Sequence, residues 1–139
     1  MDDFLLSFFL MKNKIFYPDL SYKINGILYR VHNHLGRYCN EKQYGDMIEK
    51  FLRKEGIRFE REKILPKMFK EEKEGRNKTD FLIEEKIVLE IKAKIIIEKS
   101  DYYQIMRYLR VLNKKLGLLV NFRSRYLRIK RVINPEGEI

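Results

Sequence analysis

The sequence predicts an α/β fold in which a mixed central sheet of about five strands is covered by helices on both faces. Two observations support this prediction. Two amphipathic helical segments open the chain, three strand-like segments follow, and a third helical segment separates them from two more strands. The segment 116–122, LGLLVNF, is almost wholly apolar. Such a strand is typical of a sheet that is buried on both faces.

The first two helices are predicted from apolar residues that recur at spacings of three and four. In the segment 20–36 these residues are Ile24, Ile27, Leu28, Val31 and Leu35. Asn40 is a good cap for the second helix, and Gly56 ends it. Its apolar face consists of Tyr44, Met47, Ile48, Phe51 and Leu52.

The letters His32-Asn33-His34 lie inside the first helix and do not form an HNH nuclease motif. Successive helical residues turn by about 100°, so the two histidines point in nearly opposite directions and cannot bind one metal ion. We expect His34 to be structural or solvated. His32 lies beside the apolar face, and packing is the favoured role for it.

The remaining elements follow from alternation and from turn residues. The segment 57–65 reads as a strand that is closed by Pro66 and followed by a charged loop. Two runs of branched apolar residues within 79–95 meet at the polar residues 84–86, which indicates a hairpin. A third helix is expected from about Ser100, a good cap, to Lys114. The buried strand 116–122 and an alternating edge strand at 126–133 complete the order.

The length of 139 residues, with 45% hydrophobic content, predicts one compact domain. We assign residues 15–139 to this domain and residues 1–14 to an N-terminal arm or a start-site extension. The apolar run at 4–11 is shorter than the about 20 residues that span a bilayer, and no signal peptide is recognised. The single cysteine, Cys39, excludes an internal disulfide and a cysteine-based zinc site. A cytoplasmic protein without a membrane partner is expected.

The chain carries 30 Lys and Arg against 20 Asp and Glu, a formal net charge of +10. This excess favours a polyanionic partner, because basic contacts to phosphates release condensed counterions. A Lys-rich, solvated surface is the alternative interpretation. Two clusters are candidates for phosphate contacts. The third helix carries Tyr103, Arg107, Arg110 and Lys114, and the last strand region carries Arg123, Arg125, Arg128, Lys130 and Arg131.

The residues most suited to chemistry lie on the predicted hairpin. Glu90 and Lys92 are two apart and therefore project from the same face of the strand. If the loop has three residues, Asp80 lies directly across from Glu90, whereas a two-residue loop turns it away. Two carboxylates about 4 Å apart repel by about 4 kcal/mol at an effective dielectric near 20. A divalent cation such as Mg²⁺ or Mn²⁺ between the two carboxylates makes the net electrostatic energy of the arrangement favourable. The alternative is a cross-strand salt bridge on an exposed face.

Two further polar residues are predicted to point inward. Glu41 lies three residues before Tyr44 and seven before Ile48, so it shares the apolar face of the second helix. Its alternative role is to complement the helix dipole in the first turn. Gln104 lies in line with Tyr108 and Val111 on the third helix.

The combination of Asp80, Glu90-Ile91-Lys92 and a helical Gln104 resembles the PD-(D/E)XK nuclease superfamily. The fuller resemblance is to its small GxxExxY branch and extends over about residues 20–134. It rests on VHNHLG, EKQY at 41–44, KTDFLIEEKIVLEIKAK, YYQIMRYL, GLLVNF and KRVIN. The chain departs from the pattern at Tyr38, where the branch has its eponymous Gly, and at Thr79, where the superfamily name has Pro.

This resemblance implies a three-layer α/β/α restriction endonuclease-like fold and Mg²⁺-dependent or Mn²⁺-dependent hydrolysis of nucleic acid. DNA is favoured over RNA as the partner. It implies that Asp80 and Glu90 ligate the metal with Glu41 nearby, that Lys92 orients water or stabilises charge, and that Gln104 positions water or backbone. His32 could support the site. A monomer and a homodimer both stay open, as do a non-catalytic nucleic-acid-binding module and a protein-interaction subunit on the same fold.

Overall fold

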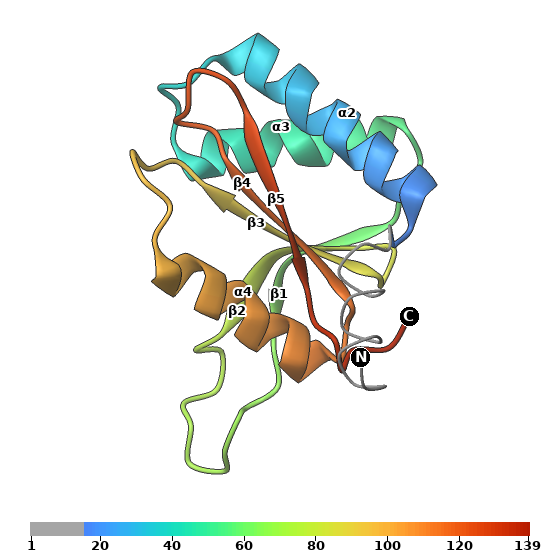
Figure 1. Cartoon of the computed structure of the whole chain (residues 1–139), viewed down its shortest axis with the longest axis vertical. Coiled ribbons are helices and arrows are strands. Elements are labelled where there is room, and N and C mark those ends of the chain that lie inside the picture. The colour runs from blue at the N-terminus through green and yellow to red at the C-terminus, as the bar shows by residue number, and fades with distance from the viewer. Residues whose placement is uncertain (1–15) are drawn as a thin grey trace, which may run out of the picture.

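The computed structural model of the chain describes residues 16–139, which form three α-helices and five strands (Figure 1). The predicted arm at residues 1–14 lies outside this part of the chain. The elements are α2 (Pro18–Leu35), α3 (Glu41–Lys54), β1 (Phe59–Ile64), β2 (Lys78–Ile83), β3 (Ile87–Lys92), α4 (Lys99–Leu112), β4 (Leu116–Asn121) and β5 (Arg128–Ile133). Within residues 16–139, no helix is long and apolar enough to cross a membrane.

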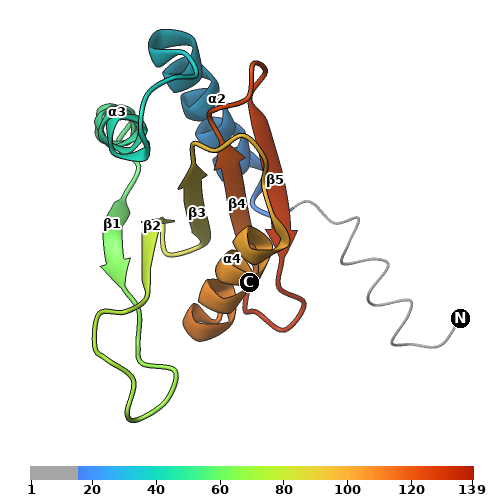
Figure 2. The same ribbon diagram turned by 90° about the vertical axis from the view of Figure 1, so that its left-hand side faces the viewer.

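The five strands form one mixed sheet in the order β1-β2-β3-β4-β5. Neighbouring strands are antiparallel except β3 and β4, which are parallel and are connected through α4. Helices α2 and α3 lie on one side of the sheet and α4 lies on the other (Figures 1 and 2). The predicted α/β fold with a mixed sheet covered on both faces is therefore confirmed.

Alternation along β3 divides the hydrophobic core into two parts. Ile87, Leu89 and Ile91 belong to the core cluster that also contains the apolar faces of α2 and α3. Val88 belongs to the cluster on the other face, together with Ile105 of α4. Even-numbered positions of β3 thus face α4, and this is the face from which Glu90 and Lys92 project.

The helix boundaries agree with the sequence at α2 and α3 but differ at α4. Asn40 caps α3 in a reciprocal capping box with Gln43, as its residue type predicts. Helix α4 is capped by Glu98 rather than Ser100, because Glu98 and Asp101 form a second capping box. The helix ends at Leu112, before the expected Lys114, because Asn113 adopts a left-handed conformation with φ of 54°.

The close packing of α4 on the sheet depends on Gly117 of β4. A Cβ atom at this position would lie 2.7 Å from Ile105 Cδ1 and 3.2 Å from Leu109 Cδ1. Replacing Gly117 with valine should therefore lower the free energy of unfolding by about 2 kcal/mol, because the larger side chain overpacks the contact. Urea denaturation followed by circular dichroism measures this loss.

Gly26 of α2 is the matched control, since no atom lies within 4 Å of a Cβ atom built there. Gly26→Ala should raise stability by roughly 0.5–1 kcal/mol, because alanine has the higher helix propensity. Equal effects of the two substitutions would contradict the proposed role of Gly117.

Candidate functional site

The loop of the β2–β3 hairpin brings Asp80 and Glu90 together. The loop has three residues, Glu84 to Lys86. With this loop length, Phe81 pairs with Leu89 and Ile83 pairs with Ile87. The same register, continued by one residue, places Asp80 opposite Glu90. Of the two loop lengths that the sequence left open, the three-residue loop is the one observed.

Side-chain hydrogen bonds take the place of the backbone ladder at this point. Glu90 Oε1 accepts hydrogen bonds from Thr79 Oγ1 at 2.7 Å and from the Asp80 backbone N–H at 3.2 Å. Asp80 Oδ2 accepts one from the Ile91 backbone N–H at 2.7 Å. Thr79, which stands where the superfamily pattern has Pro, therefore holds the Glu90 carboxyl group through its hydroxyl.

The Glu90 side chain is buried, the Asp80 side chain is half-buried, and neither carboxyl group forms a salt bridge within residues 16–139. Glu90 is only 3% exposed. Burial, followed by the nearby Asp80 charge, raises the pKa of Glu90 to about 8. Burial also raises the pKa of Asp80, against the lowering effect of the Ile91 N–H. Among residues 16–139, no Lys, Arg or His nitrogen forms a salt bridge with either carboxyl group.

Lys92 projects from the same face as Glu90 but is held by helix α4. Its Nζ donates a hydrogen bond to Gln104 Oε1 at 2.7 Å and lies 3.8 Å from Asp101 Oδ1. The Lys92 charge lowers the pKa of Asp80 and that of Glu41, although burial is the larger influence on both and raises them. The predicted inward orientation of Gln104 is thus observed, and its carbonyl oxygen orients the Lys92 ammonium group.

Asp101 is a member of this cluster that the sequence analysis missed. It is 6% exposed, and its Oδ2 accepts hydrogen bonds from Lys94 Nζ at 3.0 Å and from the Glu98 N–H at 2.8 Å. Burial acts to raise the pKa of Asp101, but the Glu98 N–H and the two lysines outweigh it, so the net shift is downward. The Glu-x-x-Asp spacing of a capping box was the signal that could have revealed it.

Glu41 differs from its prediction, because it is exposed at the start of α3 rather than packed with the apolar face. The prediction extended the apolar face of α3 to its first residue, Glu41, and this residue is not covered by the core. Glu41 nevertheless lines a cavity of about 150 Å³ together with Asp80 and Ile91. Desolvation raises the pKa of the Glu41 carboxyl group, and Lys92 partly offsets this effect.

Glu62 of β1 lines the same cavity, and the sequence analysis did not single it out. It lies between Arg61, which pairs with Phe81, and Lys63, which pairs with Thr79, so it stands opposite Asp80. Its backbone is left-handed, with φ of 52°. The negative charge of Glu62 raises the pKa of Asp80. The alternation of β1 was the one sequence signal for the position of Glu62 in the strand, because nothing in the sequence predicts its positive φ.

The donor set suits a hard divalent cation with incomplete protein ligation. Across residues 16–139, no three His, Cys, Asp or Glu side chains are arranged as a metal site. Asp80 and Glu90 supply two adjacent carboxyl groups, and neither forms a salt bridge in the part of the chain that the structure describes. Mg²⁺ and Mn²⁺ prefer oxygen ligands and keep several waters, so a pair of carboxylates is compatible with either ion.

The predicted basic residues divide into three groups. Arg128 shares a row across the sheet with Asn121 and Lys92, and it lies on the same face. Arg123 and Arg125 lie in the β4–β5 loop, near the same end of the sheet. Arg107 and Arg110 line a groove beside α4, whereas Lys114 lies beyond the end of that helix and outside the groove lining.

His32 contacts the β4–β5 loop and not the carboxyl groups. Its Nε2 lies 3.0 Å from the Ser124 carbonyl oxygen, and its ring is 6.1 Å from that of Phe122. Arg37 supports the same loop through a hydrogen bond from Nε to the Arg123 carbonyl oxygen at 2.8 Å. The favoured packing role of His32 agrees with these contacts.

A family model described as the PD-(D/E)XK nuclease superfamily matches residues 18–132. No curated protein and no solved structure matches the chain. The mixed five-stranded sheet with helices on both faces is consistent with a restriction endonuclease-like fold.

Proposed function

The chain belongs to the PD-(D/E)XK nuclease superfamily, and from this membership we propose that it hydrolyses phosphodiester bonds of nucleic acid with Mg²⁺ or Mn²⁺. DNA is the proposed substrate in preference to RNA. The proposal takes residues 15–139 as one catalytic domain of a cytoplasmic protein and assigns it to the GxxExxY branch. Glu41 and Tyr44 stand where the name of that branch has Glu and Tyr, whereas Tyr38 stands where the name has Gly.

The observation that carries the proposal is the pair of adjacent carboxyl groups of Asp80 and Glu90, both with raised pKa values and neither in a salt bridge within residues 16–139. Desolvation raises the pKa of both Asp80 and Glu90, and the negative charge of Asp80 raises the pKa of Glu90 further. A divalent cation would make ionisation of both favourable. Asp80 and Glu90 would hold the metal, which supplies an acidified water as nucleophile and positive charge at the phosphate. A purely structural pair would be less costly as two apolar residues.

The neighbouring side chains have separate roles in this proposal. Lys92, oriented by Gln104 at 2.7 Å, brings a cation to the place where negative charge develops on the scissile phosphate. Asp101 is a positioning residue, because it attracts the same ammonium group from 3.8 Å. Glu41 adds a carboxyl group at the cavity beside Asp80 and would bind water or a second cation.

Substrate contacts are proposed for two basic surfaces at the edges of the site. Arg123, Arg125 and Arg128 would hold the phosphate backbone near the end of the sheet, since Arg128 lies in the same row as Lys92. Arg107 and Arg110 would hold phosphates along α4. Such contacts position a nucleic acid without reading its sequence. They leave open whether one chain or a homodimer cuts a duplex.

Cleavage of a supercoiled plasmid and of a labelled single-stranded oligonucleotide tests the proposal. Purified wild type should cut at least one of the two substrates with Mg²⁺ or Mn²⁺ and should stop cutting in EDTA. Lys92→Ala should lower the cleavage rate by about 100-fold or more, because it removes charge stabilisation at the phosphate. Lys78→Ala, which removes an exposed lysine from β2 of the same sheet, is the control.

A second candidate function is non-catalytic nucleic-acid binding. It is favoured by the absence of a third protein ligand to a metal among residues 16–139. A folded wild type that binds DNA but cuts neither substrate with either metal would contradict the nuclease proposal and support this second function.

A further inference from the structure

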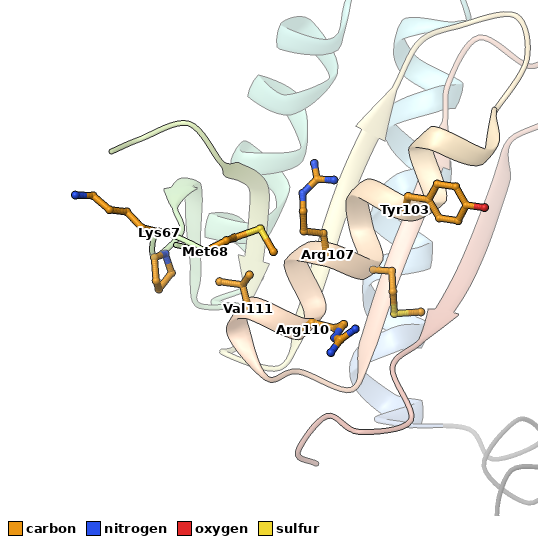
Figure 3. A pocket seen from close by; sticks show the side chains of 8 residues that line it. Lys67, Met68, Tyr103, Arg107, Arg110 and Val111 are labelled. Carbon is orange, nitrogen blue, oxygen red and sulfur yellow. The ribbon is translucent and has the colours of Figure 1, made fainter. Parts of the chain in front are cut away.

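A groove of about 690 Å³ lies beside α4 (Figure 3). One bank is α4, and the other is the start of the β1–β2 connection. The lining residues are Pro66, Lys67, Met68, Tyr103, Met106, Arg107, Arg110 and Val111. The groove has the size typical of ligand sites in proteins, which is about 300–1,000 Å³.

The lining of this groove combines positive charge with exposed apolar surface. Lys67, Arg107 and Arg110 contribute three cations, and the lining residues within 16–139 include no Asp or Glu. Tyr103 is 67% exposed and Met68 is 47% exposed. Figure 3 shows Met68 beside Val111 and Arg107 across the groove, with Lys67 extending outward from the rim. Such a combination complements a ligand that is both anionic and flat or apolar.

The bank formed by the β1–β2 connection is held in place by a buried carboxylate. Glu72 is 8% exposed and accepts hydrogen bonds from the Met68 N–H at 2.8 Å and from Asn77 Nδ2 at 3.3 Å. The Leu65 N–H in turn donates to the Asn77 carbonyl oxygen at 2.9 Å. These bonds fix the shape of the connection and direct the Glu72 charge into it rather than into the groove.

The groove begins next to the proposed catalytic cluster. Tyr103 precedes Gln104, whose side chain holds Lys92 on the inner side of α4. Arg107 and Arg110 lie about one and two turns beyond Tyr103 along the helix. A chain that occupies the groove would therefore extend from the catalytic cluster along α4.

We propose that this groove binds an unpaired nucleic-acid strand that continues from the cleavage site. Arg107 and Arg110 contact its phosphates, and Tyr103 and Met68 contact the faces of its bases. Unpaired bases are required, because the base faces of a duplex are stacked on one another and cannot reach Tyr103. This inference rests on the proposed nuclease function and adds to it that the substrate carries a single-stranded segment beside the scissile bond.

Fluorescence anisotropy with a labelled single-stranded oligonucleotide, and with the duplex of the same sequence, tests the proposal in EDTA. The double variant Arg107→Gln/Arg110→Gln should bind the single strand about tenfold or more weakly, and the slope of log Kd against log salt should fall by about 1.4. Tyr103→Ala should weaken single-strand binding by roughly tenfold through lost stacking and should leave duplex binding within twofold.

The matched control is Lys23→Gln/Lys54→Gln, which removes the same charge from exposed positions on α2 and α3. Its single-strand affinity should stay within twofold of the wild type. Equal losses in the control and the groove variant, or equal losses of single-strand and duplex binding in Tyr103→Ala, would overturn the proposal. The binding measurement contains no metal, so its outcome does not depend on cleavage. A wild type that does not cut would refute the nuclease function, and the binding measurement would still test the groove.

Discussion

Replacing Glu90 with glutamine is expected to abolish metal-dependent cleavage without unfolding the protein. Glutamine has the shape of a protonated glutamic acid, and the pKa of Glu90 is raised to about 8, so the metal-free protein already holds this residue largely neutral near pH 7. Its side-chain oxygen can still accept the Thr79 hydroxyl at the position of Oε1. The loss of a charged metal ligand should lower the cleavage rate by about 100-fold or more.

Single-turnover cleavage measures the loss of activity, and thermal unfolding of the same preparation measures whether the variant is folded. The control is Glu85→Gln, which removes an exposed carboxyl group from the loop preceding β3. It should cut as fast as the wild type. A Glu90→Gln variant that cuts within tenfold of the wild type would remove this residue from the proposed chemistry. A variant that fails to fold would contradict the neutral state assigned to Glu90.

The second large effect is a fall in the stability of the metal-free protein as pH rises. The pKa of Glu90 is 4.5 in the unfolded chain and about 8 in the folded protein. Between these values the folded state binds more protons than the unfolded state, so the free energy of unfolding decreases with increasing pH. The contribution is fully present below about pH 4.5 and is lost as pH rises through about 8. The loss should be a few kcal/mol.

Urea denaturation in EDTA at a series of pH values from about 5 to about 9 measures this dependence. Glu90→Gln provides the reference, since its side chain does not titrate, and its stability should change much less over the range. The raised pKa of Asp80 acts in the same direction and remains in the variant. Parallel pH profiles for wild type and Glu90→Gln would show that Glu90 titrates normally and is not the desolvated group described here.

The sequence predicted most of the architecture, because local patterns determine it. Alternation and apolar runs located the five strands, and the polar residues at 84–86 located the hairpin. The relation of Asp80 to Glu90 depended on one unknown, the length of the loop. A difference of one residue reverses the face of a strand, so the sequence could state the two outcomes but could not choose between them.

The parts of the site that the sequence missed depend on contacts between distant elements. Asp101 was overlooked because its importance comes from Lys92 and Lys94 across a loop, and Ser100 offered a more familiar cap. Glu62 was overlooked because its left-handed backbone has no sequence signal. Glu41 was predicted from periodicity, which cannot say whether the first turn of a helix is covered by another element.

The groove beside α4 was also beyond sequence reasoning. Arg107 and Arg110 were recognised as a basic stripe, but the opposite bank comes from Pro66, Lys67 and Met68 in a connection that read only as a charged loop. The conformation of this connection depends on Glu72, which is buried. A glutamate is normally expected on the surface, so nothing in the sequence assigned it this role.

Binding of Mn²⁺ to the metal-free protein tests the central claim most directly, because that claim is that Asp80 and Glu90 form a divalent-cation site. Electron paramagnetic resonance of free Mn²⁺, in a titration into the millimolar range near pH 7, should show one saturable site in the wild type. Asp80→Asn and Glu90→Gln should each lose it, and Glu85→Gln should keep it. A wild type without saturable binding, or binding unchanged in both site variants, would contradict the account.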